Sequence, residues 1–311
     1  MNVDLLDRLC GVAVGAAVGD ALGMPLEFGP PHPPGRRVRE MLPGRLPAGT
    51  FTDDTEMALA LAESLLAHCP LNPADLARRF VAWLKENPPD VGIHTASVLR
   101  RVAQGDDWDA AAAAVQAQHP ESAGNGSVMR CWPVTLACWS ELPAAQLERL
   151  IAESVLQSRV THPHPECNAG SAFINVTLYY LLYGFDPNKA VARALKLVEM
   201  PNSLRVVIEL APEKTHNDLP NTGWVRHTIE SVMWGLLTTS TFEDAVVNVV
   251  NLGNDADTAG TVVGALAGAM YGLSDIPARW RDAVQGEFPL GSGRRWRADD
   301  LTDLAQRLAA Q

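Results

Sequence analysis

The stretch TDDTEMALALAESLLAH, residues 52–68, indicates the kind of fold that this chain adopts. Its apolar residues recur at helical spacing, so they share one face of a helix. Two adjacent carboxylates, Asp53 and Asp54, stand between two threonines at the start of that helix. A second stretch, GNDADTAGT (253–261), again places acids and a threonine before an apolar run. The function of the chain must explain why it has two such helix starts.

Helical patterning continues along most of the chain, while alternating strand-like runs are almost absent. The Pro- and Gly-rich segments between the helical runs are short, so no flexible linker divides the chain. The sequence therefore predicts an all-α fold, built as a single compact multi-helix domain over residues 1–311. Besides helices in 52–68 and 75–86, we expect helices over 94–104, 108–118, 143–157, 168–183, 187–199, 224–239, 241–250, 258–272 and 299–310.

Four glycines mark one face of the first expected helix, at Gly11, Gly15, Gly19 and Gly23. Residues four apart lie on the same side of a helix. A glycine inside a helix costs about 1 kcal/mol relative to alanine, so this repeated face predicts that another backbone packs very close to it. Direct contact with a ligand is the alternative.

Composition narrows the class of protein. With 47% hydrophobic residues the chain can bury a large core, and its net charge of −11 argues against nucleic acid as a partner. The short basic runs at 35–39 and 293–297 are expected to be solvated loops. Five cysteines without a C-x-x-C pair suit a reducing cytoplasm. The apolar run 9–19 follows acidic residues and ends at Asp20, so we expect neither a secretory signal nor a membrane span.

Helix capping is the simplest role for the two acid clusters, because Thr and Asp cap helix N-termini and acids stabilise the first turn. Each cluster, however, contains more oxygen ligands than one cap requires. Carboxylates gathered near a core repel one another and resist ionisation unless a cation compensates. The absence of Cys and His from both motifs favours a hard ion such as Mg²⁺ or Mn²⁺. Two such ions, held by both helix starts, are therefore the alternative to capping.

A third element is GNGSVMR (124–130), in which two glycines flank Asn125 before an apolar run. Backbone N–H groups at such a turn can bind phosphate oxygens. An ordinary Asn-Gly turn explains the same residues. The segment by itself leaves both interpretations open.

The chain resembles the ADP-ribosylglycohydrolase family in seven segments, which occur in this order: GDALGMPLEF (19–28), TDDTEMAL (52–59), DVG (90–92), GNGSVMR (124–130), THPHPECNAG (161–170), GWVRHTIESVMWGL (223–236) and NLGNDADTAGTVVGALAGAMYG (251–272). The two acid motifs and the glycine-rich first helix are specific in combination, and the resemblance covers nearly the whole chain. It implies an all-helical domain with a binuclear Mg²⁺ or Mn²⁺ centre. Such a domain hydrolyses the glycosidic bond between ADP-ribose and a modified acceptor.

The resemblance also implies roles for individual residues. The metal ligands would be Thr52, Asp53, Asp54, Asp255, Asp257 and Thr258, with Asp257 bridging the ions. The catalytic residues would be Glu27, Asp54 and Asp90: Asp54 or Glu27 would take a proton from water, and Asp90 would contact the ribose or the leaving guanidinium. ADP-ribose would contact Asn125, Gly126, Ser127, His162, Gly223 and Trp224, with the first three at the diphosphate.

The expected substrate is an ADP-ribosylated protein, with arginine as the favoured linkage and free ADP-ribose as the product. The sequence does not identify the acceptor protein. Two other functions remain open at this point. One is a two-metal phosphohydrolase that attacks the diphosphate, and the other is a non-catalytic ADP-ribose-binding or crystallin-like structural protein.

Overall fold

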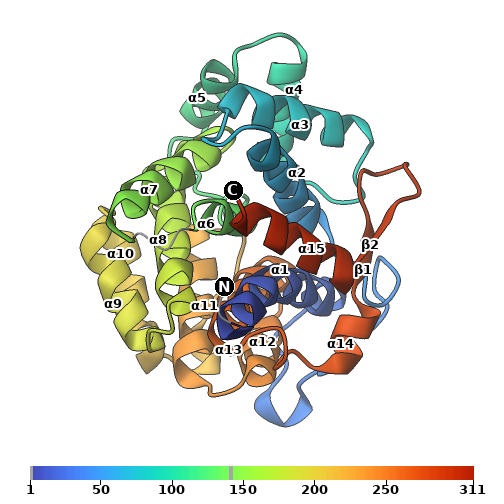
Figure 1. Cartoon of the computed structure of the whole chain (residues 1–311), viewed down its shortest axis with the longest axis vertical. Helices are drawn as coiled ribbons and strands as arrows, with labels where there is room; N and C mark the ends of the chain where they lie inside the picture. Colours follow the sequence, from blue (N-terminus) through green and yellow to red (C-terminus); the bar gives the residue numbers. More distant parts are fainter. Residues whose placement is uncertain (1–2, 140–142) are drawn as a thin grey trace.

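The computed structural model describes residues 3–139 and 143–311, and these residues are mainly helical (Figure 1). Their only named strands, β1 (Gln285–Glu287) and β2 (Arg295–Arg297), pair as a short antiparallel hairpin. The all-α prediction is therefore confirmed. The α-helices are α1 (Val3–Gly23), α2 (Asp53–Ala67), α3 (Pro73–Lys85), α4 (Ile93–Ala103), α5 (Trp108–Gln118), α6 (Trp132–Ala137), α7 (Pro143–Arg159), α8 (Pro165–Leu182), α9 (Pro187–Leu197), α10 (Asn202–Leu210), α11 (Val225–Thr238), α12 (Phe242–Val250), α13 (Ala256–Tyr271), α14 (Ala278–Ala283) and α15 (Ala298–Ala309). Single-turn 3-10 helices are η1 (Met24–Leu26), η2 (Pro34–Arg36), η3 (Ala211–Glu213) and η4 (His216–Asp218).

The basic run 293–297 was expected to be a solvated loop, and this is wrong for its second half. Residues 295–297 form β2, because the alternation Arg-Trp-Arg turns Trp296 inward, where it is 3% exposed. The indole Nε1 of Trp296 donates to the Phe288 carbonyl at 2.8 Å, which satisfies its polar atom. A period-two pattern of three residues was too short to recognise as a strand.

The glycine face of α1 packs directly on α13, and the two helices lie side by side near the centre of Figure 1. A Cβ atom on Gly19 would lie 1.9 Å from the carbonyl oxygen of Gly260, and one on Gly15 would lie 2.3 Å from that of Gly264. Helix α13 has its own glycines at the reciprocal positions. Close backbone packing therefore explains the repeated glycines, as the sequence predicted.

This packing also brings the end of α1 to the start of α13. A Cβ atom on Gly23 would lie 2.4 Å from the carbonyl oxygen of Ala256, the first residue of α13. The chain that follows α1 consequently runs past the second acid motif. Glu27 lies in this segment, directly after η1.

Helix α1 is apolar because it is a core helix. The stretch Asp4–Leu26 is the single candidate membrane span among the described residues, yet 94% of its most apolar window is buried inside the fold. Leu9, Val14 and Leu22 are completely buried. Its hydrophobicity thus matches its position between α13 and α15.

Candidate active site

The two acid motifs meet in space. Thr258 Oγ1, in the first turn of α13, donates to Asp54 Oδ2, in the first turn of α2, at 3.5 Å. Neither N-cap residue, Thr52 or Asp255, forms a side-chain hydrogen bond that caps its own helix. Simple N-capping, which the sequence left open, therefore does not explain the clusters.

The start of α2 is instead held by Asp20, an acid in the last turn of α1 that is completely buried. Its carboxylate accepts from the backbone N–H and the hydroxyl of Thr52, at 3.0 and 2.9 Å, and from those of Thr55, at 3.1 and 2.6 Å. Asp20 was not among the residues expected in the site, although it is the one charged residue in the apolar stretch 9–26. Because Asp20 accepts hydrogen bonds from backbone N–H groups at the start of α2, Asp53 and Asp54 are not needed to cap this helix.

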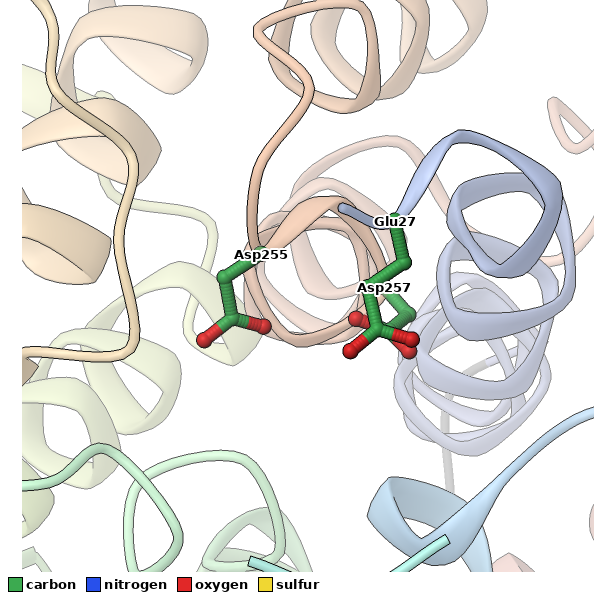
Figure 2. Close-up of side chains that lie close together, drawn as sticks. All are labelled: Glu27, Asp255 and Asp257. Atoms are coloured by element: carbon green, nitrogen blue, oxygen red, sulfur yellow. The ribbon is translucent and has the colours of Figure 1, made fainter. Parts of the chain in front are cut away.

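Three further carboxylates point toward one another at the start of α13 (Figure 2). One oxygen each from Glu27, Asp255 and Asp257 lies within 4.8 Å of the others. Asp255 and Asp257 flank the first residue of the helix, and Glu27 arrives from the segment after α1. The packing of α1 on α13 thus assembles acids from distant parts of the chain.

Burial raises the pKa of these aspartates, because desolvation disfavours the charged form. The pKa of Asp257 rises to about 6 and that of Asp255 to about 7. The pKa values of Asp53 and Asp54 lie well above the ordinary range, first through burial and then through repulsion by neighbouring carboxylates. Without a cation, this cluster resists full ionisation near neutral pH.

The donor set fits divalent cations. Asp54 Oδ1 is buried and has no hydrogen-bond partner within the described ranges. A buried carboxylate oxygen without a hydrogen bond is unfavourable unless a positive group lies beside it. Every expected ligand offers an oxygen atom, the donor that Mg²⁺ and Mn²⁺ prefer. The residues present are therefore suited to hard metal ions.

A cavity of about 380 Å³ opens beside the acids. The acids form part of its lining, together with the loop around Asn125 and the ring of His162. The expected site residues that line it are Glu27, Asp53, Asp54, Asp90, Asn125, Gly126, His162, Gly223, Asp255, Asp257 and Thr258. The structure thus gathers eleven of the fourteen expected residues around one space.

Three expected residues lie outside this lining. Thr52 is buried behind the acids, and its hydroxyl also lies 3.3 Å from Asp54 Oδ2. Ser127 turns its hydroxyl toward that of Ser158, at 3.0 Å, in a buried group. Trp224 lines a neighbouring cavity of about 240 Å³, which shares Gly124 and Gly223 with the first. The backbone around Gly223 therefore separates Trp224 from the acid cluster.

Asn125 connects the glycine-rich loop to the acids. Its side-chain Nδ2 donates to Asp255 Oδ2 at 2.7 Å and to Thr228 Oγ1 at 2.8 Å. Its backbone N–H donates to the carbonyl of Gly223 at 3.1 Å. The Asn-Gly turn is therefore more than a chain reversal, because it fixes the position of one expected metal ligand.

The histidine at position 162 is paired with a second one that sequence analysis left without a role. The rings of His94 and His162 lie 4.8 Å apart, and both residues line the cavity. Burial lowers the pKa of each imidazole, that of His162 to well below its ordinary range. Both rings are therefore neutral at physiological pH.

Arg45 is a functional candidate that the sequence did not reveal. Its guanidinium donates to Glu27, to Asp90 and, at 3.3 Å, to Asp257 Oδ2. It therefore places a positive charge among three acids of the site. Arg45 lies in a segment rich in Pro, Gly and Arg, where no pattern distinguishes it from its neighbours.

The helical fold and two oxygen-rich helix starts beside one cavity define the class of protein. The family model for ADP-ribosylglycohydrolase matches residues 1–311, and the chain belongs to this family. The resemblance inferred from the seven sequence segments is thereby confirmed.

Individual relatives agree with the family assignment. The chain is 35% identical over 293 residues to the ADP-ribosylarginine hydrolase Tri1 of Serratia proteamaculans, covering 90% of this chain and 75% of that protein. It is 34% identical over 281 residues to the ADP-ribosyl-dinitrogen reductase glycohydrolase of Rhodospirillum rubrum, covering 88% and 89%. A solved structure titled ADP-ribosylglycohydrolase-related protein complex matches with a TM-score of 0.79 and 32% identity, over 99% of both chains.

Proposed function

We propose that this protein is a hydrolase, dependent on two Mg²⁺ or Mn²⁺ ions, that removes ADP-ribose from ADP-ribosyl-arginine on a protein. The observation that carries the proposal is the meeting of Asp54 with Thr258 beside a cavity also lined by Asn125, Gly126 and His162. The identities of 35% and 34% to relatives named for ADP-ribosylarginine and for ADP-ribosyl-dinitrogen reductase support the linkage.

The two clusters would hold the cations through Thr52, Asp53, Asp54, Asp255, Asp257 and Thr258. When bound, the ions would supply Lewis acidity to the ribose hydroxyls and to the attacking water. Thr52 can serve as a ligand through its oxygen lone pairs, because its hydroxyl proton is directed to Asp20 at 2.9 Å. Asn125 would hold Asp255 in place from the other side.

The chain's own acids would then move protons. Cleavage of a ribosyl bond passes through an oxocarbenium-like transition state. Asp54 or Glu27 would accept the proton of the attacking water, and Asp90 would contact the leaving guanidinium. Since such acid–base assistance contributes about 10²–10⁴-fold, we expect Asp90→Ala to lower turnover by that order without unfolding the protein.

The rest of the ligand would lie along the loop. The diphosphate would contact the segment Asn125–Gly126–Ser127 and His162, and the adenosine would extend past Gly223 toward Trp224. Ser127 would contribute its backbone N–H, because its side chain faces away from the cavity. The two cavities share Gly124 and Gly223 in their linings, so the ligand would extend from the first cavity past these residues toward the second.

We also propose that residues 1–311 act as one catalytic domain in the cytoplasm. One hydrophobic cluster extends from Leu9 to Leu308 and supports the single domain. All five cysteines are free, and four of them are buried, which suits a reducing compartment.

Mass spectrometry of the products tests the activity directly. A panel of ADP-ribosyl linkages to arginine, serine, nucleic acid and acetyl ester would be incubated with the protein, with and without EDTA. We expect free ADP-ribose from the arginine linkage, and only without EDTA. Release of AMP would identify a phosphohydrolase instead, and intact substrates throughout would indicate a binding or structural protein.

A further inference from the structure

We propose that Arg130 is a positioning residue that acts through Thr161 to hold His162 in the Nε2–H tautomer. In this form the imidazole donates a hydrogen bond to an oxygen of the bound ADP-ribose. The identity of that ligand rests on the proposed function, whereas the tautomer rests on the contacts of the protein alone.

Arg130 is a completely buried cation without an acidic partner in the described part of the chain. Its Nε and Nη2 donate to the side chain and the carbonyl of Gln157, both at 3.2 Å, and its guanidinium lies 4.5 Å from the centre of the Phe80 ring. Nη2 also donates to Thr161 Oγ1 at 2.7 Å. A guanidinium can only donate hydrogen bonds, so the direction of this contact is certain.

The contact with Arg130 also determines the direction of the hydrogen bond between the Thr161 hydroxyl and His162. Thr161 is completely buried, and its Oγ1 lies 2.7 Å from His162 Nδ1. Because Oγ1 already accepts from Arg130, its own proton is free to point at Nδ1. If Nδ1 carried a proton instead, that hydroxyl proton would be buried without an acceptor among the contacts of the described chain, which is unfavourable. Nδ1 is therefore the acceptor, and the ring proton lies on Nε2.

In this tautomer the proton on Nε2 lies beside the glycine-rich loop, at a residue that lines the cavity. Nε2 lies against the glycine-rich loop, 3.2 Å from the position of a Cβ atom on Gly126 and 3.3 Å from one on Gly124. The ring is 3% exposed and lines the cavity, and the structure shows no protein acceptor for Nε2 in the residues it describes. His162 is thus a buried donor in the lining of the cavity, beside the glycine-rich loop.

The groups that surround His162 keep it uncharged. Burial, the neighbouring His94 and the Arg130 charge all hold its pKa well below the ordinary value. His94 itself is turned so that its Nε2 meets the Thr161 carbonyl at 2.9 Å. Arg130 therefore both excludes a second positive charge and selects the tautomer.

The backbone beside the ring favours an oxygen acceptor. The N–H groups of Gly126 and Ser127 have no acceptor within residues 3–139 and 143–311. With the Nε2–H group of His162 they supply three neutral donors, of which those of Gly126 and His162 belong to residues that line the cavity. A diphosphate oxygen satisfies such donors, since anions are bound by converging N–H groups.

Two measurements on a matched pair of variants test this inference. Thr161→Val removes the hydroxyl, and Thr161→Ser keeps it. The first measurement is ¹⁵N NMR of selectively labelled histidines between pH 6 and 8, with His162→Gln to assign the signals. The second is the affinity for ADP-ribose, by calorimetry. Thr177→Val is the control, because it removes another buried threonine hydroxyl, which bonds the Phe173 carbonyl at 2.8 Å away from the site.

We expect the parent protein, Thr161→Ser and Thr177→Val to show a single Nε2–H signal pattern for His162. Thr161→Val should show a mixture of tautomers and bind ADP-ribose about three- to tenfold more weakly, the value of one neutral hydrogen bond. A folded Arg130→Met variant should also show mixed tautomers. An Nδ1–H tautomer in the parent protein, or an unchanged tautomer in Thr161→Val, would overturn the inference. Failure of the parent to bind ADP-ribose would reject the proposed function. The tautomer of His162 would still test whether Arg130 is a positioning residue.

Discussion

Thr258 donates to the carboxylate of Asp54 at 3.5 Å, across 204 residues of sequence. This contact joins the first turns of two helices whose acids are expected, from the sequence, to hold a shared pair of cations. In the proposed metal site each motif would supply part of one ligand set, so neither would be complete without the other. The loss of one motif should therefore disable the entire metal site.

We predict that Asp257→Ala loses Mn²⁺ binding in a calorimetric titration and loses nearly all release of ADP-ribose. The reason is that Asp257 is the expected bridge between the ions and lies in the group formed with Glu27 and Asp255. Asp303→Ala is the control, since its side chain is 68% exposed on α15. Parental hydrolysis of ADP-ribosyl-arginine by Asp257→Ala would refute the metal assignment.

A second prediction concerns Asp54 and pH in the presence of EDTA. A carboxyl whose pKa is raised on folding stabilises the protein at low pH, and this contribution is lost as pH rises through the folded pKa. The pKa of Asp54 is raised well above its ordinary value by burial and by the charges of Asp20 and Asp257. Asp54→Asn should therefore raise the free energy of unfolding at pH 8 by about 1–3 kcal/mol, with little gain at pH 4.

Urea denaturation of the parent and Asp54→Asn across this pH range measures the difference, and Asp303→Asn serves as the exposed control. Addition of Mn²⁺ should stabilise the parent and not the variant, because only the parent has the complete ligand set. If Asp54→Asn were less stable than the parent at pH 8 in EDTA, mutual repulsion in the cluster would be disproved.

A third prediction tests the packing of α1 on α13. A Cβ atom on Gly264 would lie 2.1 Å from the carbonyl oxygen of Gly15. Gly264→Ala should therefore destabilise the protein by about 3 kcal/mol, because the backbones have to separate. Gly35→Ala is the matched control, since a Cβ atom there meets nothing within 4 Å. Equal denaturation midpoints for the two variants would contradict the close contact.

A fourth prediction concerns Arg45, whose guanidinium contacts Glu27, Asp90 and Asp257. A divalent cation needs some of the same oxygens. Arg45→Gln removes the competing charge and should raise the affinity for Mn²⁺ about three- to tenfold, the range of one charge-assisted hydrogen bond near the surface. Arg36→Gln controls for the loss of an exposed arginine in the same segment. A weaker affinity in Arg45→Gln would show that Arg45 supports the metal site instead.

The sequence predicted those helices whose apolar periodicity and end residues lie within the segment itself. The start of α9, for example, has Pro187 as its first residue and Asp186 as its cap, which accepts from two backbone N–H groups. Helices α6, α10 and α14 were missed. The six residues of α6 and of α14 cover less than two turns and show no clear period, and α10 has only nine residues. The strand at 295–297 was missed for the same reason.

The site was predictable where its residues form short motifs and not where they arrive from elsewhere. Asp54 and Asp257 stand in recognisable acid clusters, so their proximity could be proposed from sequence. Arg45 reaches the site only through tertiary packing, and nothing beside it in the chain indicates this. Arg130 ends the segment GNGSVMR and His94 lies just after DVG, but neither motif indicates what these two side chains contact. Such residues become visible only when the fold places their side chains next to the motifs.

The contact between Gly19 and Gly260 also bears on how the chain is made. During translation α1 leaves the ribosome well before α13, which begins only at Ala256. At about 5–20 residues per second, the apolar helix α1 waits on the order of 10–50 s for the surface that covers it. A nascent chain in this state exposes α1 to every other apolar surface nearby. Chaperones that shield hydrophobic segments are consequently expected to associate with this protein until the second acid motif has been synthesised.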